Sequence, residues 1–179
     1  MPTIATPPSS SVWRPMTQAD FPSVGAIGAA VHVAFPEAPA IVAERHGLYP
    51  AGCLVLCGAA GMIGYAVSHP WRFLHPPKLD TVLGQLPAAP DTYYIHDLAL
   101  LPAARGTGAG SDAVRRLIEQ AKAEKFGNLS LVAVSGSAPF WARHGFQVHA
   151  DPAVQQRLRS YGEAARFMVR ATPKGDLQQ

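Results

Sequence analysis

The residues that most clearly suggest a chemistry form a glycine-rich segment, Arg105-Gly106-Thr107-Gly108-Ala109-Gly110, between a predicted strand and a predicted helix. Glycines let several backbone N–H groups converge on an anion, and the start of a helix adds about half a positive charge. The Arg105 guanidinium can add a charged hydrogen bond to the same anion. The segment therefore predicts a phosphate or pyrophosphate site. For the glycines alone, a simple turn into the helix is an equally good explanation.

Three phosphate-binding patterns can be compared with this segment. A Walker A loop requires Lys and then Ser or Thr after its last glycine, whereas Ser111 and Asp112 follow here, so that pattern is excluded. A dinucleotide-binding loop requires G-x-G-x-x-G, and Gly106 and Gly108 lack the third glycine at the required position. The acidic residue that should end a second strand, Glu124, lies on the same predicted helix. The dinucleotide pattern therefore fits poorly.

The third spacing, Arg-x-x-Gly-x-Gly, matches in full at Arg105, Gly108 and Gly110. It resembles the acetyl-CoA-binding motif of the GNAT superfamily of N-acetyltransferases. Three flanking segments look like that family's fourth strand, fifth strand and following helix; they are residues 94–102, 129–134 and 138–146. The matching motifs cover roughly residues 92–147, and the first half of the chain is similar only in its pattern of elements.

The resemblance implies that acetyl-CoA is the cosubstrate and where it is held. The loop that would bind the pyrophosphate consists of Arg105, Gly106, Thr107, Gly108, Ala109, Gly110 and Ser111. The backbone of Leu98, Ala99 and Leu100 would pair with the pantetheine arm as if it were an added strand, where the family's fourth and fifth strands separate. The amide near Leu100 would polarise the thioester carbonyl. Ser135 and Trp141 stand at two further positions where the resemblance implies coenzyme contacts.

An amine that attacks a thioester must be neutral, and removing the proton of an ammonium group costs about 4–5 kcal/mol at pH 7. We therefore expect a base. His96 is the first candidate, because it lies just before the coenzyme-pairing residues and imidazole titrates near neutral pH. A structural hydrogen bond is the alternative role for His96. Asp97 points to the opposite face of an ideal strand, so a β-bulge would be needed to redirect it.

The departing thiolate needs a proton, and here the sequence differs from the family pattern. Many members place a Tyr in the helix after the fifth strand, where this chain has Trp141, and an indole cannot act as that acid. Either the thiolate leaves unassisted or another residue such as Tyr161 supplies the proton, and Trp141 itself is expected to pack in the core. Many members also carry Asn at the position of Ser135.

The resemblance implies direct transfer to a small-molecule or peptide amine in a ternary complex. The amine would enter between the first helical region and the last strands, near Phe35, Glu37, Tyr161 and a proline-rich loop at residues 69–91. A surface charge is the alternative for Glu37. Two rival functions are a non-catalytic acyl-CoA-binding or regulatory domain of the same fold, which Trp141 favours, and a nucleotide-binding oxidoreductase, which the glycine pattern disfavours.

Hydrophobic periodicity and turn residues predict the elements that position these groups. Strands are expected at residues 11–14, 53–57, 62–68, 92–101, 129–134, 146–149 and 166–171. Helices are expected at about 17–33, 38–46, 138–144 and 151–160, with a further helix from Gly110 to a C′ residue at Gly127 and a single turn after Asp80. The pattern predicts one α/β (α+β) domain at residues 11–172, with a mixed sheet of about six or seven strands flanked by helices, and tails at 1–10 and 173–179.

Composition narrows the class of protein. The chain has 179 residues, 48% of them hydrophobic and 15% charged, so we expect one domain with a packed core. The formal charge is +3 and no Lys/Arg run exceeds two residues, which argues against nucleic-acid and membrane-surface partners. A second copy of the chain is a further candidate partner.

Cysteine and histidine spacing bears on redox and metal chemistry. Cys53 and Cys57 lie about 13 Å apart if their segment is a strand, too far for a disulfide. Residues 1–10 lack the features of a secretory signal, so a cytoplasmic protein is expected. His69, His75 and His96 are too irregularly spaced to suggest zinc, and no metal is expected.

Overall fold

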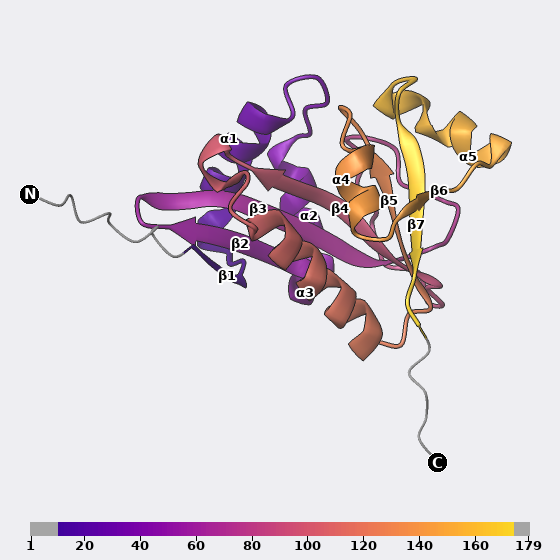
Figure 1. Cartoon of the computed structure of the whole chain (residues 1–179), viewed down its shortest axis with the longest axis horizontal. Coiled ribbons are helices and arrows are strands. Elements are labelled where there is room, and N and C mark those ends of the chain that lie inside the picture. Colours follow the sequence, from indigo (N-terminus) through magenta and orange to yellow (C-terminus); the bar gives the residue numbers. More distant parts are fainter. Residues whose placement is uncertain (1–10, 174–179) are drawn as a thin grey trace, which may run out of the picture.

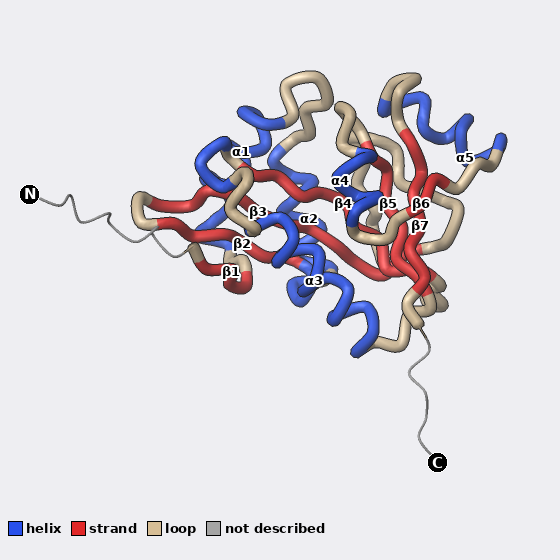
Figure 2. The backbone as a smooth tube through the Cα atoms, viewed as in Figure 1, coloured by secondary structure: helices blue, strands red, loops and turns tan. Residues whose placement is uncertain are grey.

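Seven strands form one mixed sheet in the order β1-β2-β3-β4-β5-β7-β6 (Figures 1 and 2). They are β1 (Val12–Pro15), β2 (Cys53–Gly58), β3 (Gly61–Trp71), β4 (Thr92–Leu100), β5 (Asn128–Ala133), β6 (Gln147–Val148) and β7 (Arg166–Ala171). All paired neighbours run antiparallel except β4 and β5, which run parallel. This computed structural model describes residues 11–173, so the predicted tails lie outside the described residues apart from Pro173.

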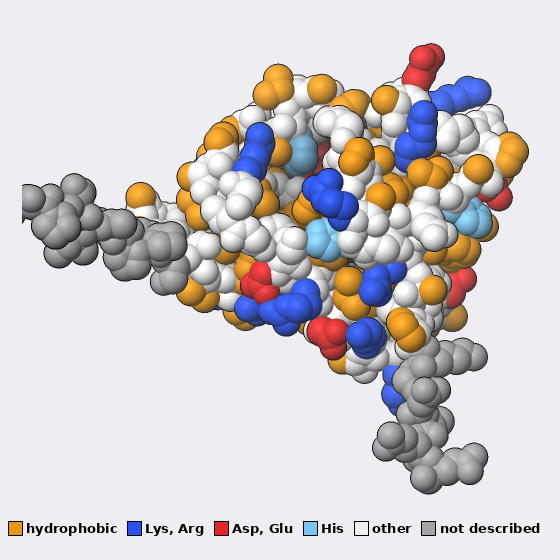
Figure 3. All heavy atoms as spheres, viewed as in Figure 1, with side chains coloured by type: hydrophobic (Ala, Val, Ile, Leu, Met, Phe, Trp, Pro, Cys, Tyr) orange, Lys and Arg blue, Asp and Glu red, His pale blue; other side chains and the backbone are white. Residues whose placement is uncertain are grey.

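Helices cover both faces of the sheet, which confirms the predicted fold class (Figure 1). They are α1 (Phe21–Val31), α2 (Pro39–Leu48), α3 (Ala109–Ala123), α4 (Ala138–Arg143) and α5 (Pro152–Arg157). α1 and α2 pack against one face and α3 packs against the other. Basic, acidic and apolar side chains are interspersed over the face shown in Figure 3. In the described part of the chain, every helix is too short or too polar to cross a membrane.

The structure corrects three local predictions. α3 ends before Gly127, because Lys125 takes the C′ position with φ 62° and the N–H groups of Lys125 and Phe126 close a Schellman motif on the last turn. β3 continues to Trp71, so the first residues assigned to the proline-rich loop are strand. The segment after Asp80 forms bends and irregular backbone, not the expected turn of helix.

α3 is held on the sheet by an apolar stripe and by one buried hydrogen bond. Its buried residues recur at helical spacing and form one hydrophobic cluster with side chains of the sheet. They include Ala113, Val114, Leu117, Ile118 and Ala121. The indole Nε1–H of Trp13 in β1 donates to the Ala109 carbonyl at 3.1 Å. The start of α3, which follows the glycine-rich loop, is therefore tied to β1 at one edge of the sheet.

A β-bulge interrupts β4 at His96. Val67 of β3 pairs with Asp97 and Ser68 pairs with Ile95, so His96 is the extra residue. Before the bulge Ile95 faces the α3 side of the sheet, and after it Leu98 again faces that side. The bulge thus directs the two intervening side chains, His96 and Asp97, to the face covered by α1. A bulge of the kind that could redirect Asp97 is therefore present.

β4 and β5 separate soon after they begin. They pair only over Tyr93–Ile95 and Leu129–Leu131 and diverge beyond these residues (Figure 2). The N–H of Leu101 donates to Ile63 of β3, and backbone groups of alternate residues point to opposite sides of a strand. Leu98 and Leu100 therefore direct their backbone groups into the gap between β4 and β5, and Ala99 directs its own towards β3.

Leu117→Ala should lower the free energy of unfolding by about 2–5 kcal/mol, because Leu117 is almost fully buried beneath α3 and truncation leaves a cavity. Glu119→Ala on the exposed side of the same helix should change it by less than about 0.5 kcal/mol. Urea unfolding followed by circular dichroism measures both values. Similar losses for the two variants would contradict the assignment of the core.

Candidate functional site

The gap between β4 and β5 is lined by residues that the sequence analysis placed in separate roles. A cavity of about 370 Å³ lies there. The proposed catalytic residues that line it are His96, Asp97 and Tyr161. The proposed coenzyme contacts that line it are Leu98, Arg105, Ser135 and Trp141. His32 and Glu37 line the same cavity.

The glycine-rich loop lies at the end of this gap and leads into α3. Gly108 caps the helix with φ 89°, a conformation that residues with a side chain rarely adopt. A Cβ at Gly110 would lie 3.2–3.3 Å from Phe140 and Leu100, so a larger residue would crowd the packing here. The first N–H groups of α3 have no intrahelical partner, and together with the helix dipole they suit an anion.

Two side chains fix the shape of this loop. The Thr107 hydroxyl donates to the Ala104 carbonyl at 2.7 Å and accepts from the Ala109 N–H at 3.3 Å. The Nε–H of Arg105 donates to the Leu100 carbonyl at 3.1 Å, which confirms that this carbonyl faces away from β3. The guanidinium of Arg105 is exposed at the edge of the cavity. Ser111 lies on the first turn of α3, where its hydroxyl contacts His144 Nε2 at 3.3 Å.

His96 is paired with a carboxylate from the loop between α1 and α2. Its Nε2 lies 2.8 Å from Glu37 Oε2, and the two side chains are 2% and 15% exposed. Burial opposes ionisation of Glu37, but the hydrogen bond and charge of His96, the Asp80 N–H and the Arg45 charge together lower the pKa of Glu37. Since Glu37 is then a carboxylate, His96 donates to it, and the Nδ1 of His96 is buried without a partner among the described residues. Neither nitrogen of His96 is free to meet a substrate amine.

In the second pair β4 supplies the carboxylate instead of the histidine: Asp97 is paired with His32 at the end of α1. His32, the C-cap of α1, places its Nε2 2.7 Å from Asp97 Oδ1, and the Tyr65 hydroxyl donates to Asp97 Oδ2 at 2.5 Å. The hydrogen bond to Asp97 raises the pKa of His32 above its usual value, against the effect of burial. His32 is 23% exposed, the most accessible of these paired histidines and carboxylates. Its Nδ1 makes no hydrogen bond to the described residues, and His32 lines the cavity.

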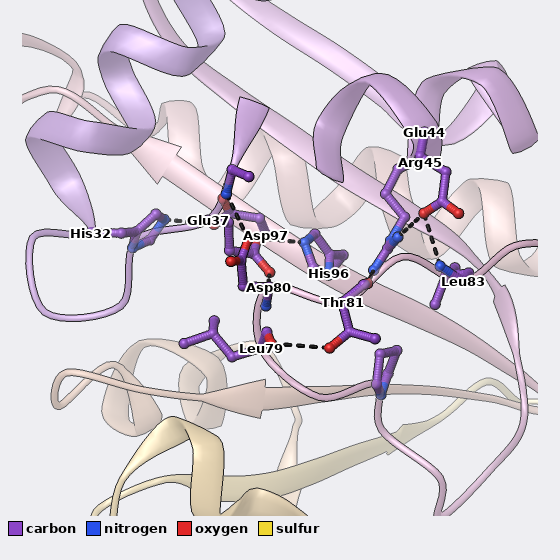
Figure 4. Close-up of polar contacts among 12 residues, drawn as sticks. His32, Glu37, Glu44, Arg45, Leu79, Asp80, Thr81, Leu83, His96 and Asp97 are labelled. Atoms are coloured by element: carbon purple, nitrogen blue, oxygen red, sulfur yellow. Dashed lines mark hydrogen bonds and ion pairs between the residues drawn. The ribbon is translucent and has the colours of Figure 1, made fainter. Parts of the chain in front are cut away.

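The proline-rich loop holds the α1–α2 loop in place (Figure 4). Asp80 accepts the Ala38 N–H at 2.6 Å and donates its own N–H to Glu37 Oε1 at 3.1 Å. Farther along, the fully buried Arg45 of α2 donates to the Thr81 carbonyl at 2.9 Å and pairs with Glu44. The loop therefore fixes the carboxylate that faces His96.

Trp141 and Tyr161 close the cavity on the β5 side. Trp141 is 7% exposed and packs edge-on against Phe140 and Phe146, which fits the packing role expected for it. Tyr161 is also 7% exposed, and its hydroxyl donates to the Pro77 carbonyl at 2.9 Å. Burial raises the pKa of Tyr161 well above its usual value, so the phenol stays protonated. Ser135 is exposed at the cavity edge with φ 52°.

Comparison with known families decides what this arrangement is. The model of the acetyltransferase (GNAT) family matches residues 19–146, which is more than half of the chain. The chain belongs to the GNAT acetyltransferase family. This membership supports acyl transfer from a CoA thioester. A search of curated protein sequences gives no significant match.

Solved structures agree in fold. The GNAT-like decarboxylase GphF, bound to isobutyryl-CoA, superposes with a TM-score of 0.75 at 16% identity, over 89% of this chain and 98% of that one. The ribosomal-protein-S18-alanine N-acetyltransferase of Escherichia coli gives 0.64 at 16% identity, over 95% and 100%. N-acetylglutamate synthase of Neisseria gonorrhoeae, complexed with coenzyme A and N-acetyl-glutamate, gives 0.70 at 16% identity. The match covers 93% of this chain but only 36% of that one.

Two paired side chains of this GNAT chain, those of His32 and Glu37, were not predictable in these positions from the sequence. His32 follows the last periodic residue of α1 and has no motif around it, so no signal in the sequence marks it. Glu37 was assigned to the acceptor region with a surface charge as its alternative, yet its side chain is largely buried and paired. Within residues 11–173 no three metal-ligating side chains gather in one place.

The pKa of His32 should lie above the usual value of 6.5, and Asp97→Asn should lower it, because that substitution removes the hydrogen bond that favours the imidazolium. Titration of the histidine ring protons by NMR measures both values. His149→Gln, which changes an exposed histidine outside the cavity, assigns a different signal and should leave the His32 titration as it is. A His32 pKa that is the same with and without the Asp97 carboxylate would contradict the pairing.

Proposed function

We propose that this GNAT protein transfers an acetyl group from acetyl-CoA to a primary amine, with direct attack in a ternary complex. One observation carries the proposal: the open backbone edge of β4 leads directly to two histidine–carboxylate pairs in the same cavity. An acyl group carried along that edge would lie beside His32, which can accept a proton, and beside two carboxylates that favour a cationic amine. Family membership supports the acyl-CoA part of the proposal, and the two pairs support the amine part.

The coenzyme would lie along the gap. The N–H groups at the start of α3 and the Arg105 guanidinium offer donors for the pyrophosphate. Leu98 and Leu100 offer backbone groups to the pantetheine arm, and the N–H of Leu100 can donate to the thioester oxygen as negative charge develops there. Ala99 is paired with β3, so it supports the strand without contacting the arm through its backbone.

We propose that His32 takes the proton of the amine through Nδ1. As a neutral imidazole held by Asp97 it has a free lone pair at the cavity, and the raised pKa strengthens it as a base. The ammonium group first loses one proton to water. The neutral amine nitrogen then bonds to the carbonyl carbon, the C–S bond breaks, and His32 receives the proton that the nitrogen loses in this step. His96 acts as a positioning residue, because it orients the Glu37 carboxylate towards an incoming ammonium group.

The thiolate requires a hydrogen-bond donor on the other side of the cavity. We propose Tyr161, which lines the cavity and stays protonated. Its hydroxyl would turn from the Pro77 carbonyl to donate a hydrogen bond to the sulfur as the thiolate leaves, and because burial holds the phenol proton in place, water then supplies the proton that converts the thiolate to the thiol. A thiol pKa near 8.5 makes this assistance modest, which is compatible with Trp141 in place of an acid.

The fold alone does not decide the reaction, since GphF is a decarboxylase on a similar fold. The test is release of CoA thiol from acetyl-CoA in the presence of a panel of primary amines, followed with a chromogenic thiol reagent. We expect amine-dependent release, and His32→Gln should lower kcat/KM at least about tenfold and remove the rise in rate with pH above 6.5.

His149→Gln is the matched control, because it removes an exposed histidine outside the cavity. Binding of acetyl-CoA without turnover of any amine would favour the non-catalytic domain. Binding of NAD in place of acetyl-CoA would favour the oxidoreductase. Unchanged kcat/KM in His32→Gln would remove His32 from the role of base.

A further inference from the structure

A second cavity of about 530 Å³ lies between α1, α2 and the sheet. Most of its wall is apolar or lacks a side chain, with Phe21, Val24 and Gly25 from α1 and Val42 from α2. The volume falls within the range of small-molecule sites, which are concave, mainly apolar and fitted with a few placed polar groups. No part of this wall belongs to the glycine-rich loop or to the open edge of β4 beyond Asp97.

This second cavity adjoins the first at its polar end. Four residues line both: His32, Phe35, Glu37 and Asp97. The Glu37 and Asp97 carboxylates are 15% and 12% exposed, and each is held by a histidine. Two carboxylates beside apolar walls favour a cationic group at this junction with an apolar body beyond it. A molecule oriented in this way would present its amine to the gap that is assigned to the thioester.

Two glycines of α1, Gly25 and Gly28, line this cavity and widen it because they carry no side chain. Gly28 lets the Tyr65 hydroxyl approach, since a Cβ there would lie 3.0 Å from that oxygen. Gly25 has no such neighbour, because a Cβ built there meets nothing within 4 Å. A glycine inside a helix costs about 1 kcal/mol relative to alanine, and the helical backbone does not require one at this position. The space beside Gly25 is therefore a feature of the cavity wall, with no packing partner to explain it.

We propose that this cavity is a subsite for the apolar body of the acceptor, so that the substrate class is a primary amine carried on an aromatic or branched aliphatic group. The inference rests on the proposed function and specifies its acceptor. The ammonium group lies against Glu37 and Asp97. It gives one proton to water, and His32 takes the second at the junction as the nitrogen attacks. The apolar body fills the space beside Gly25 and Val42, where its transfer from water adds to the binding free energy.

The test compares ethylamine, butylamine and 2-phenylethylamine as acceptors of acetyl-CoA. We expect kcat/KM to rise about fourfold for each added methylene that is buried, hence about 16-fold from ethylamine to butylamine and at least as much from ethylamine to 2-phenylethylamine. Gly25→Leu, which fills the cavity with a good helix former, should reduce the preference for 2-phenylethylamine over ethylamine about tenfold. Ala26→Leu adds the same side chain on the exposed side of α1 and should leave the preference as it is.

Thermal unfolding of both variants checks that each is folded. No preference in the wild type, or a preference that survives Gly25→Leu, overturns the proposal. If no amine is acetylated, the proposed function fails, and calorimetry of 2-phenylethylamine with CoA present tests the subsite by itself. Weaker binding to Gly25→Leu than to Ala26→Leu supports the subsite, whereas equal binding, or no binding to the wild type, overturns it.

Discussion

A single extra residue in β4 determines what the rest of this site can do. His96 has no partner in β3, and its insertion reverses the alternation of side chains, so that it and Asp97 share the α1 face of the sheet. In a regular strand one of them would lie beneath α3, separated by the sheet from the α1–α2 loop. The bulge also marks where β4 and β5 stop pairing. The placement of the carboxylates and the opening of the backbone edge therefore occur at one point in the chain.

The buried carboxylates of Glu37 and Asp97 require hydrogen-bond partners, and the surrounding loops and strands supply them. Buried carboxylates are costly unless they are paired and hydrogen-bonded. Glu37 has His96 and the Asp80 N–H, and Asp97 has His32 and Tyr65. Satisfying these groups fixes the α1–α2 loop against the proline-rich loop. The proposed direct transfer from a thioester requires a proton-accepting group placed rigidly next to an open strand edge.

The sequence was sufficient for the parts of the fold that depend on repeated patterns. The buried stripe of α3 and the glycines before it predicted the helix and its N-terminal loop, and apolar runs predicted the strands. Pairings between distant residues were not predictable, because no local pattern encodes them: Glu37 meets His96 across 59 positions. Nor does any composition signal mark Lys125 as the left-handed C′ residue when Gly127 stands two positions later.

Hydrogen exchange at three neighbouring amides of β4 tests the central claim most directly, namely that the coenzyme adds to the open edge of this strand. NMR-detected exchange is measured with and without acetyl-CoA. We expect acetyl-CoA to slow exchange at Leu98 and Leu100, whose N–H groups face the gap, and to change exchange little at Ala99, which is already paired with β3. Equal exchange at Leu98 and Leu100 with and without saturating acetyl-CoA would contradict it.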